Sequence, residues 1–481
     1  MKKIIIYILF SIGFLSCESL VDGDLNDDPN NPSGAPAELL LTGVQFANVT
    51  THEGLTARMS AMWTSQMKGV DRQWGDFQVY NVSGSNFNNM WDNVFYGTLR
   101  NSTLILDQIE PLGLTAFEGV VKVTQAHCIG NCTALWGDIP FREAARIEEF
   151  QAPVFDPQLD LYAELQVLLD DAIADLETGI GAPTSDIFYG GDPDLWIQAA
   201  YTLKARFYLD TRQYDLAAQA AANGISSFEN SMYVPHGTVN DVDQNMYWDF
   251  LGPSRGGDVA ASDNDGENPA YLVTLLDPES PVYRGNAKTN ETGRFNYYYL
   301  EANESVNTPG KIEPNTLAEG IFAQSASFPL VTYQENILTL AETAARADNF
   351  EAALGHLNEY RSFLNSGGYL SAPLQADSLV AYLPYEAADF ASGGMENPDG
   401  VAPATALLRE IMEERYVSFF GQTIAWNDER RIRGSEVALP IQPNAGSQLP
   451  WRFVYSQDEI NGNPNVPDPV PGPFDNMAIY E

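Results

Sequence analysis

The chain has 481 residues, of which 44% are hydrophobic, so it is long enough to bury a substantial core and too apolar to be wholly disordered. Its 65 Asp and Glu residues outnumber its 25 Lys and Arg residues, which gives a net charge of −40. Because such a chain repels phosphate backbones and anionic headgroups, we expect neither a nucleic-acid partner nor electrostatic binding to a membrane.

Residues 1–16 have the features of a secretory signal. Lys2 and Lys3 precede an apolar run over 4–15, which is shorter than the roughly 20 residues of a transmembrane helix. After this run, Ser16 and Cys17 complete a phrase that looks like a bacterial lipobox, so we expect the Cys17 thiol to be lipidated and to begin the mature chain. The alternative is an ordinary signal peptide cut beside an incidental cysteine. Pro, Asn and Asp are frequent in 17–36, which predicts a flexible tether.

The segments with a clear period are helical. Apolar residues recur on one helical face over 161–176. The stretches 199–222 and 337–357 share a pattern of two Ala-rich helices separated by a polar turn and an aromatic residue, Tyr214 or Phe350. Each resembles a tetratricopeptide unit, in which helix pairs stack because one pair cannot bury its own face. Two copies are too few for a free-standing solenoid, so other segments must complete the core.

Three segments between these helices are rich in Gly, Asn, Asp, Pro and aromatic residues, with little helical period. We therefore predict a single, mainly α-helical domain over 37–481, with tetratricopeptide-like helix pairs and a long irregular, loop-rich half. Its insertions lie near 223–327, 365–403 and 433–481. Because long loops in compact domains are often functional, we expect the first insertion to be ordered and to carry function.

Three clusters combine aromatic rings with polar side chains, as a carbohydrate site requires for sugar C–H faces and hydroxyls. They lie in 71–80, 245–250 and 283–286. The candidate ligand-binding residues are Arg72, Trp74, Phe77, Tyr80, Tyr247, Trp248, Tyr283, Arg284 and Asn286. The alternative is that these rings fill a core beneath the loops. Four other tryptophans lie in helical or motif phrases and are assigned to the core: Trp91, Trp136, Trp196 and Trp426.

One acidic turn offers oxygen ligands of the kind that calcium prefers. Asp263, Asp265 and Glu267 make it a candidate for structural Ca²⁺, although it lacks the full twelve-residue loop and a solvated turn is the alternative. No other cofactor or metal is predicted. Cys128 and Cys132 are four residues apart among apolar neighbours, which favours two core thiols over a metal site; a strained local disulfide is the alternative.

We expect none of three enzymatic motifs: a Gly-x-Ser-x-Gly nucleophile elbow, a His-Glu-x-x-His pair or a glycine-rich phosphate loop. With 65 carboxylates, acid content alone cannot nominate a glycosidase pair. We therefore expect a protein without catalytic activity and nominate no catalytic residue.

Five phrases occur in order along the chain. The first is the Asn- and Pro-rich segment 28–32, followed by 39–40, and the second is Trp-Gly-Asp-Ile-Pro within 135–144. The third is Tyr-Gly-Gly-Asp within 186–192, followed by Trp196 and 203–206. The fourth joins 332–335 to 341–346, and the fifth joins 413–416 to Trp-Asn-Asp-Glu-Arg-Arg at 426–431. Together they resemble the SusD/RagB (SusD-like) family, the lipid-anchored substrate-binding proteins of Bacteroidota nutrient uptake.

The resemblance implies a helical domain with four tetratricopeptide-like pairs and an irregular half that carries the binding surface. It implies a protein anchored by lipid at the outer membrane and exposed at the cell surface. It also implies that the protein captures an oligosaccharide, or in some branches a peptide, and delivers it to a SusC-like TonB-dependent transporter. The alternatives from other classes are a lipid-anchored glycoside hydrolase and a peptide-binding tetratricopeptide adaptor.

Overall fold

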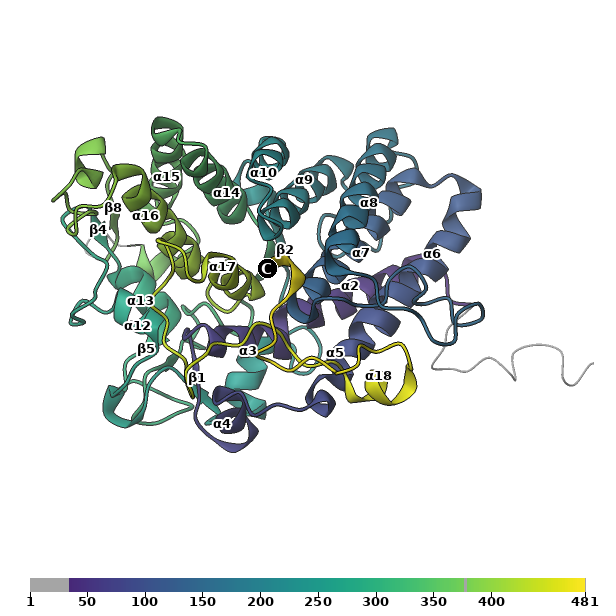
Figure 1. Cartoon of the computed structure of the whole chain (residues 1–481), viewed down its shortest axis with the longest axis horizontal. Coiled ribbons are helices and arrows are strands. Elements are labelled where there is room, and N and C mark those ends of the chain that lie inside the picture. The colour runs from purple at the N-terminus through teal and green to yellow at the C-terminus, as the bar shows by residue number, and fades with distance from the viewer. Residues whose placement is uncertain (1–33, 376–378, 481) are drawn as a thin grey trace, which may run out of the picture.

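The computed structural model describes residues 34–375 and 379–480, and in them the predicted mainly α-helical class is confirmed (Figure 1). The expected signal, Cys17 and most of the tether lie outside the described residues. The α-helices are α2 (Ala37–Glu53), α3 (Leu55–Trp63), α4 (Arg72–Gln78), α5 (Asn88–Asp92), α6 (Asn101–Ile109), α7 (Thr115–Trp136), α8 (Gln158–Thr178), α9 (Pro193–Asp210), α10 (Tyr214–Ala221), α11 (Met246–Asp249), α12 (Tyr271–Leu276), α13 (Thr292–Tyr298), α14 (Tyr333–Arg346), α15 (Phe350–Asn365), α16 (Pro403–Ser418), α17 (Thr423–Ile432) and α18 (Gln457–Gly462).

Short strands and tight helical turns complete the chain. The strands are β1 (Lys68–Gly69), β2 (Met232–Val234), β3 (Val259–Ala260), β4 (Thr289–Asn290), β5 (Tyr299–Leu300), β6 (Glu313–Pro314), β7 (Phe328–Val331) and β8 (Ala381–Tyr382). They form antiparallel pairs: β1 with β3, β2 with β7, β4 with β8, and β5 with β6. Two segments are π-helical, η2 (Asn93–Arg100) and η5 (Phe250–Ser254), and the 3₁₀ turn η1 (Gly84–Phe87) leads into α5.

Paired helices form one layer of the molecule. Helix α7 packs on α8, α9 on α10, and α14 on α15. Figure 1 shows α8, α9, α10, α14, α15 and α16 side by side along one edge. The two helix pairs that the sequence predicted are α9–α10 and α14–α15, and in each the marked aromatic residue, Tyr214 or Phe350, begins the second helix.

Small residues and caps explain how these helices pack. Helices α7 and α9 approach each other at Gly130, where a Cβ would lie 2.1 Å from the Phe207 ring. Helix α9 begins with Pro193 at its first turn, and the Asp192 carboxylate caps it by accepting from the N–H of Asp194 at 3.0 Å.

The loop-rich segments lie against this helical layer and share its core. The predicted insertions near 223–327, 365–403 and 433–481 carry only short helices and strands in their described residues. One cluster of buried hydrophobic side chains runs from Leu40 to Tyr480 and includes residues of both the helices and the insertions. Trp91, Trp136, Trp196 and Trp426 are all buried, as predicted.

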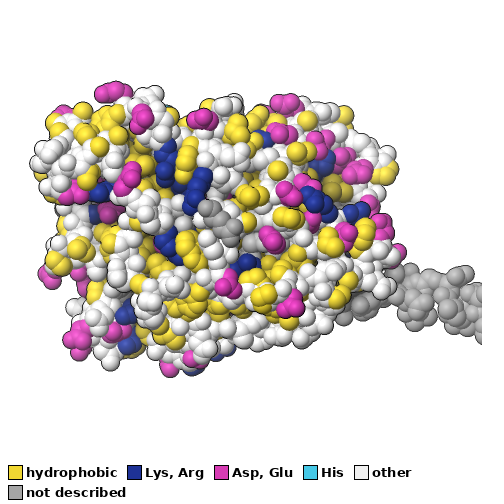
Figure 2. All heavy atoms as spheres, viewed as in Figure 1, with side chains coloured by type: hydrophobic (Ala, Val, Ile, Leu, Met, Phe, Trp, Pro, Cys, Tyr) yellow, Lys and Arg dark blue, Asp and Glu magenta, His cyan; other side chains and the backbone are white. Residues whose placement is uncertain are grey.

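The surface carries the excess of acidic residues. Figure 2 shows acidic side chains scattered over the face seen in Figure 1, with several Lys and Arg side chains gathered near its middle. Among the helices of the described residues, none combines the length and the apolar character needed to cross a bilayer.

Candidate functional site

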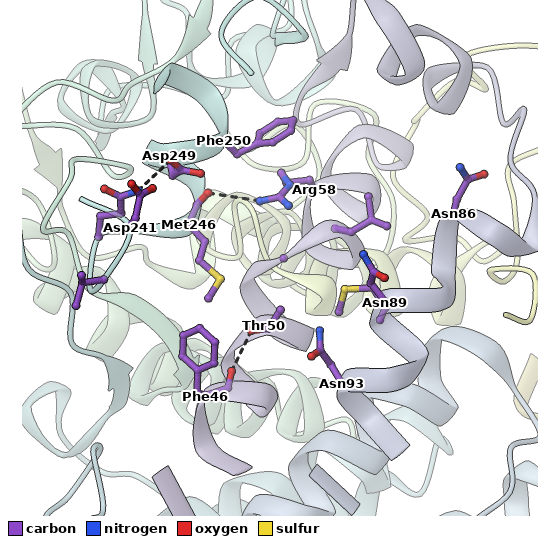
Figure 3. A pocket seen from close by; sticks show the side chains of 15 residues that line it. Phe46, Thr50, Arg58, Asn86, Asn89, Asn93, Asp241, Met246, Asp249 and Phe250 are labelled. Carbon is purple, nitrogen blue, oxygen red and sulfur yellow. Dashed lines mark hydrogen bonds between the residues drawn. The ribbon is translucent and has the colours of Figure 1, made fainter. Parts of the chain in front are cut away.

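A pocket of about 580 Å³ opens between the N-terminal helices and the first loop-rich insertion (Figure 3). Its walls come from α2 and α3, from the helical run through η1, α5 and η2, and from the segment that contains α11 and η5. The lining residues are Phe46, Thr50, Gly54, Leu55, Arg58, Asn86, Asn89, Met90, Asn93, Asp241, Val242, Gln244, Met246, Asp249 and Phe250. Its volume lies within the range of about 300–1,000 Å³ that is typical of small-molecule sites.

One aromatic ring and a row of amides face each other across part of this pocket. Phe46 on α2 is 57% exposed, so its ring can meet a ligand. Asn86, Asn89 and Asn93 follow the helical spacing i, i+3 and i+7, which places them on one side of their helical run, as Figure 3 shows. In the described part of the chain, the amides of Asn89 and Asn93 form no hydrogen bond, so their donors and acceptors are available to a ligand.

Arg58 on α3 contributes the pocket's cation. Its guanidinium carbon lies 4.2 Å from the centroid of the Phe250 ring and 5.8 Å from that of Trp74. Its Nη1 donates one long hydrogen bond, of 3.5 Å, to the Met246 carbonyl, and its Nε is buried without a hydrogen-bond partner. Burial lowers the pKa of Arg58 from its ordinary value, because charge is costly away from water.

Glu53 at the end of α2 holds the insertion in place beside the pocket. One oxygen of its buried carboxylate accepts from the Met246 N–H at 2.8 Å, and the other contacts His236 Nε2 at 2.9 Å. Burial lowers the pKa of His236, but the hydrogen bond and charge of Glu53 outweigh this effect, and the pKa lies above its ordinary value. These two contacts of Glu53 therefore hold in position the wall that carries Met246.

Both π-helical segments contribute to the lining. Asn93 opens η2 and Phe250 opens η5. Helical segments of this kind are rare and are often found at functional sites. Their presence on two walls supports this pocket as the candidate site.

The first predicted cluster lies behind the pocket instead of lining it. Trp74 is 2% exposed and packs on Phe250, with ring centroids 4.5 Å apart. Phe77 and Tyr80 are also buried, and the Tyr80 hydroxyl accepts from the Asn444 N–H at 2.7 Å. Arg72 is exposed but pairs with Asp258 at 2.6 Å. The expectation of a stacking platform here differs from the structure, because these rings have no face open to a ligand.

The second predicted cluster reaches the pocket through its neighbours. Tyr247 is fully buried, stacks on Phe322 at 4.2 Å and donates to the Gly421 carbonyl at 2.7 Å. Trp248 is half-buried and does not line the pocket. Met246, Asp249 and Phe250 of the same segment do line it. The predicted segment therefore supplies part of the pocket's wall, but through residues other than the two that were predicted.

The third predicted cluster belongs to a buried polar network elsewhere. The Arg284 guanidinium pairs with Glu410, Glu413 and Glu414, each at 2.9 Å, and with Glu291. Tyr283 and Asn286 bond within the same region, Tyr283 to the Glu291 N–H and Asn286 to Glu396. None of the three lines the pocket, so here too the rings and polar groups hold the fold together.

The acidic turn at 263–267 carries one ion pair and two exposed acidic residues. Asp263 pairs with Lys68 at 2.9 Å, which lowers the pKa of this carboxyl, while Asp265 and Glu267 are exposed. No group of three His, Cys, Asp or Glu suited to a metal occurs among the described residues, so structural Ca²⁺ remains a prediction without support from the geometry.

Cys128 and Cys132 are free, buried thiols on α7. Burial raises the pKa of Cys128 to about 11.

The expected absence of a Gly-x-Ser-x-Gly pattern is wrong as a statement about the sequence, because the pattern occurs at 252–256, next to the site. In hydrolases this pattern forms a sharp turn between a strand and a helix. Here Ser254 ends η5, which follows α11, and its hydroxyl donates to Asp249 at 2.7 Å. The pattern therefore lacks the context of a nucleophile elbow.

Sequence analysis also missed the residues that make the pocket: Phe46, Arg58 and the three asparagines. The helical spacing of Asn86, Asn89 and Asn93 was a signal that could have been read. Nothing in the sequence marks Phe46 or Arg58, because their exposure depends on where the insertion packs.

Comparison with known proteins identifies relatives that share this architecture. A family model named SusD-like, described as "Starch-binding associating with outer membrane", matches residues 29–456. Among solved structures, a SusD/RagB family protein from Bacteroides thetaiotaomicron is 21% identical, with 90% of this chain and 95% of that chain covered and a TM-score of 0.65. A SusD homologue from Bacteroides fragilis is 17% identical, with 93% and 99% covered and a TM-score of 0.64. A chitin-binding protein is 18% identical, with 89% and 94% covered and a TM-score of 0.61. No curated protein sequence matches the chain.

Proposed function

Because the chain belongs to the SusD-like family, whose description is starch-binding in association with the outer membrane, we propose that it binds an oligosaccharide in the pocket between α2, α5 and α11. The observation that carries this proposal is the exposed Phe46 ring standing in one pocket with the unpaired amides of Asn89 and Asn93. A sugar presents C–H faces that pack on aromatic rings and hydroxyls that bond to amides.

The proposed role is capture without bond cleavage. Members of the family are binding proteins, and the Ser254 pattern lacks the context of a nucleophile. Both Asp249 oxygens already accept hydrogen bonds, from Gln244 at 2.9 Å and from Ser254 at 2.7 Å. Asp249 is therefore held as a structural acceptor instead of being free to act as a general acid or base.

The wider role is proposed from the family and from the N-terminus. The protein would be anchored through lipid on Cys17, exposed at the surface of the outer membrane, and would deliver its ligand to a SusC-like TonB-dependent transporter. The association of the family with the outer membrane supports this placement. A lipobox-like sequence ahead of the domain supports the anchor.

The experiment is titration calorimetry of the delipidated protein with a panel of oligosaccharides, followed by mass spectrometry of the recovered ligand. We expect at least one oligosaccharide to bind and to be recovered intact. Replacing Phe46 with Ala should weaken its binding about 2- to 10-fold, since a stacked ring contributes about 0.5–1.5 kcal/mol.

A matched control is Val167→Ala, which truncates a 60% exposed residue on α8 away from the pocket and should leave affinity unchanged. Equal affinities of the wild type and Phe46→Ala would place the ligand elsewhere. Shortened ligand after incubation would favour a glycoside hydrolase, and binding of peptides alone would favour an adaptor.

A further inference from the structure

Arg58 is a cation without an acidic partner in the wall of the pocket. In the part of the chain that the structure describes, no carboxylate lies within ion-pair distance of its guanidinium. Its five N–H donors make one hydrogen bond, the long one to Met246. The other contacts are the faces of Phe250, Trp74 and Tyr247, which stabilise a cation but accept no conventional hydrogen bond.

Several arginines buried elsewhere in this chain are paired with carboxylates, although Arg430 and Arg452 form no ion pair among the described residues and donate instead to the Trp451 and Trp136 carbonyls. Arg206 binds Glu335 through two nitrogens, Arg284 contacts four glutamates, and Arg415 binds Asp428 at 2.8 Å. Buried charges are normally paired because desolvation without a partner is costly. Arg58 likewise has no such partner, and among these arginines it is the one that lines the candidate site.

The nearest acids are committed to other donors. Glu53 accepts from Met246 and His236, and Asp249 accepts from Gln244 and Ser254. Figure 3 shows Asp241 on the side of Met246 away from Arg58, and Asp241 is exposed at the rim. Glu53 and Asp249 therefore act on Arg58 only as nearby charges, without a direct contact, and its donors remain available to a ligand.

We infer that the pocket recognises an acidic oligosaccharide, whose carboxylate or sulfate group binds the Arg58 guanidinium. This inference rests on the proposed function of the same pocket. Arg presents a planar fork of donors that matches the paired oxygens of such groups. Asn89 and Asn93 supply further amide donors in the same pocket, and Phe46 supplies the apolar face for the sugar ring.

The net charge of the chain does not prevent this contact. Repulsion between exposed charges is screened over about 8 Å at physiological ionic strength, whereas a contact ion pair at a desolvated site is screened much less. The charge of −40 therefore slows the approach of an acidic ligand more than it weakens the short-range contact.

The test compares matched ligands by calorimetry on the delipidated protein. One arm uses an oligogalacturonide and its carboxyl-reduced form; the other uses a chondroitin sulfate oligosaccharide and its desulfated form. In at least one arm we expect the acidic ligand to bind 10-fold or more tightly than its neutral counterpart. The arm that shows the preference identifies the anionic group.

Variants assign the preference to Arg58. Arg58→Gln should abolish the difference between acidic and neutral ligands, and Arg58→Lys should retain part of it, because charge is kept but the fork is lost. Arg255→Gln is the matched control, since Arg255 is exposed, lies outside the lining and is also without an ion pair among the described residues.

Each outcome decides between the two proposals. Equal binding of acidic and neutral ligands by the wild type, or a preference that survives Arg58→Gln, would overturn the inference while leaving oligosaccharide binding in place. Failure of the wild type to bind any member of the panel would overturn both. Should Arg58→Gln fail to fold, the wild-type comparison and Arg58→Lys still decide.

Discussion

His52 and His127 lie face to face between α2 and α7, and both rings are buried. Their centroids are 3.7 Å apart, and the planes differ by 19°. His52 Nδ1 donates to the Asn48 carbonyl at 2.8 Å, and its Nε2 is buried without a partner. Burial lowers the pKa of both histidines, that of His52 to about 3. Both are therefore neutral at physiological pH, because the buried interface between α2 and α7 does not stabilise their charged forms.

This neutrality predicts a loss of stability in mild acid. The pKa of His52 is about 3 in the folded protein against an ordinary value of 6.5, so between these values the unfolded chain binds the proton and the folded one does not. The free energy of unfolding therefore falls as the pH drops through this range. Between pH 7.5 and 5.0 we expect His52 alone to remove about 2 kcal/mol.

Urea denaturation at the two pH values measures this effect. His52→Gln keeps a donor for the Asn48 carbonyl but does not titrate, so its loss over the same interval should be smaller by that amount. An equal loss in the variant and the wild type would show that His52 is not the group responsible.

At the scale of single residues, the sequence shows which types of side chain are present, but it does not show which of them are exposed to a ligand. Trp74 and Tyr247 were proposed as ligand contacts because they are aromatic and have polar neighbours, yet both are buried. The same composition suits a ring in the core and a ring in a binding site. Long-range packing decides whether a given ring is buried in the core or exposed in a binding site. For this reason the sequence does not distinguish Phe46, which lies in a helix of ordinary composition.

Elements are joined by the residues of the family phrases. Arg206 on α9 and Glu335 on α14, from two phrases 129 positions apart, form a bidentate pair with both contacts at 2.6 Å. Arg431 on α17 likewise pairs with Glu342 on α14. The sequence identified these phrases and the helix pairs that carry them, because a helical period and a resemblance are local signals. It could not show that the phrases meet, since partners far apart leave no local pattern.

We predict that Glu335→Gln destabilises the protein strongly. The side chains of Arg206 and Glu335 are 9% and 2% exposed, so removing the carboxylate leaves a buried guanidinium without a counter-charge. The free energy of unfolding should fall by about 3–5 kcal/mol in urea denaturation.

The double variant Arg206→Met with Glu335→Gln should recover much of this loss, because no unpaired charge remains. Asp170→Asn is the control: Asp170 pairs with Lys204 at 2.7 Å but is 65% exposed, so the change should be at most about 1 kcal/mol. A similar effect of the two single substitutions would contradict the role assigned to burial.

At the scale of the whole molecule, the pocket exists because three distant segments meet. Residues 46–58, 86–93 and 241–250 supply its walls, and the Glu53 contacts with Met246 and His236 hold the last segment against the first. The sequence predicted that the insertion near 223–327 carries function, and this segment does supply one wall. The opening itself could not be predicted, because a cavity is defined by what the packed segments leave unfilled.

The expected lipid anchor makes a prediction for the whole chain that does not depend on the pocket. If Cys17 carries the acyl chains, Cys17→Ser should move the protein from the membrane fraction to the soluble fraction. Each acyl CH₂ buried in the bilayer contributes about 0.8 kcal/mol, and the net charge of −40 disfavours electrostatic attachment to anionic lipid. Cell fractionation followed by immunoblotting measures this partition. Ser16→Ala, which keeps a small residue before an intact Cys17, should remain in the membrane fraction. Membrane association of Cys17→Ser equal to that of the wild type would mean that a protein partner, and not lipid, holds the chain at the membrane.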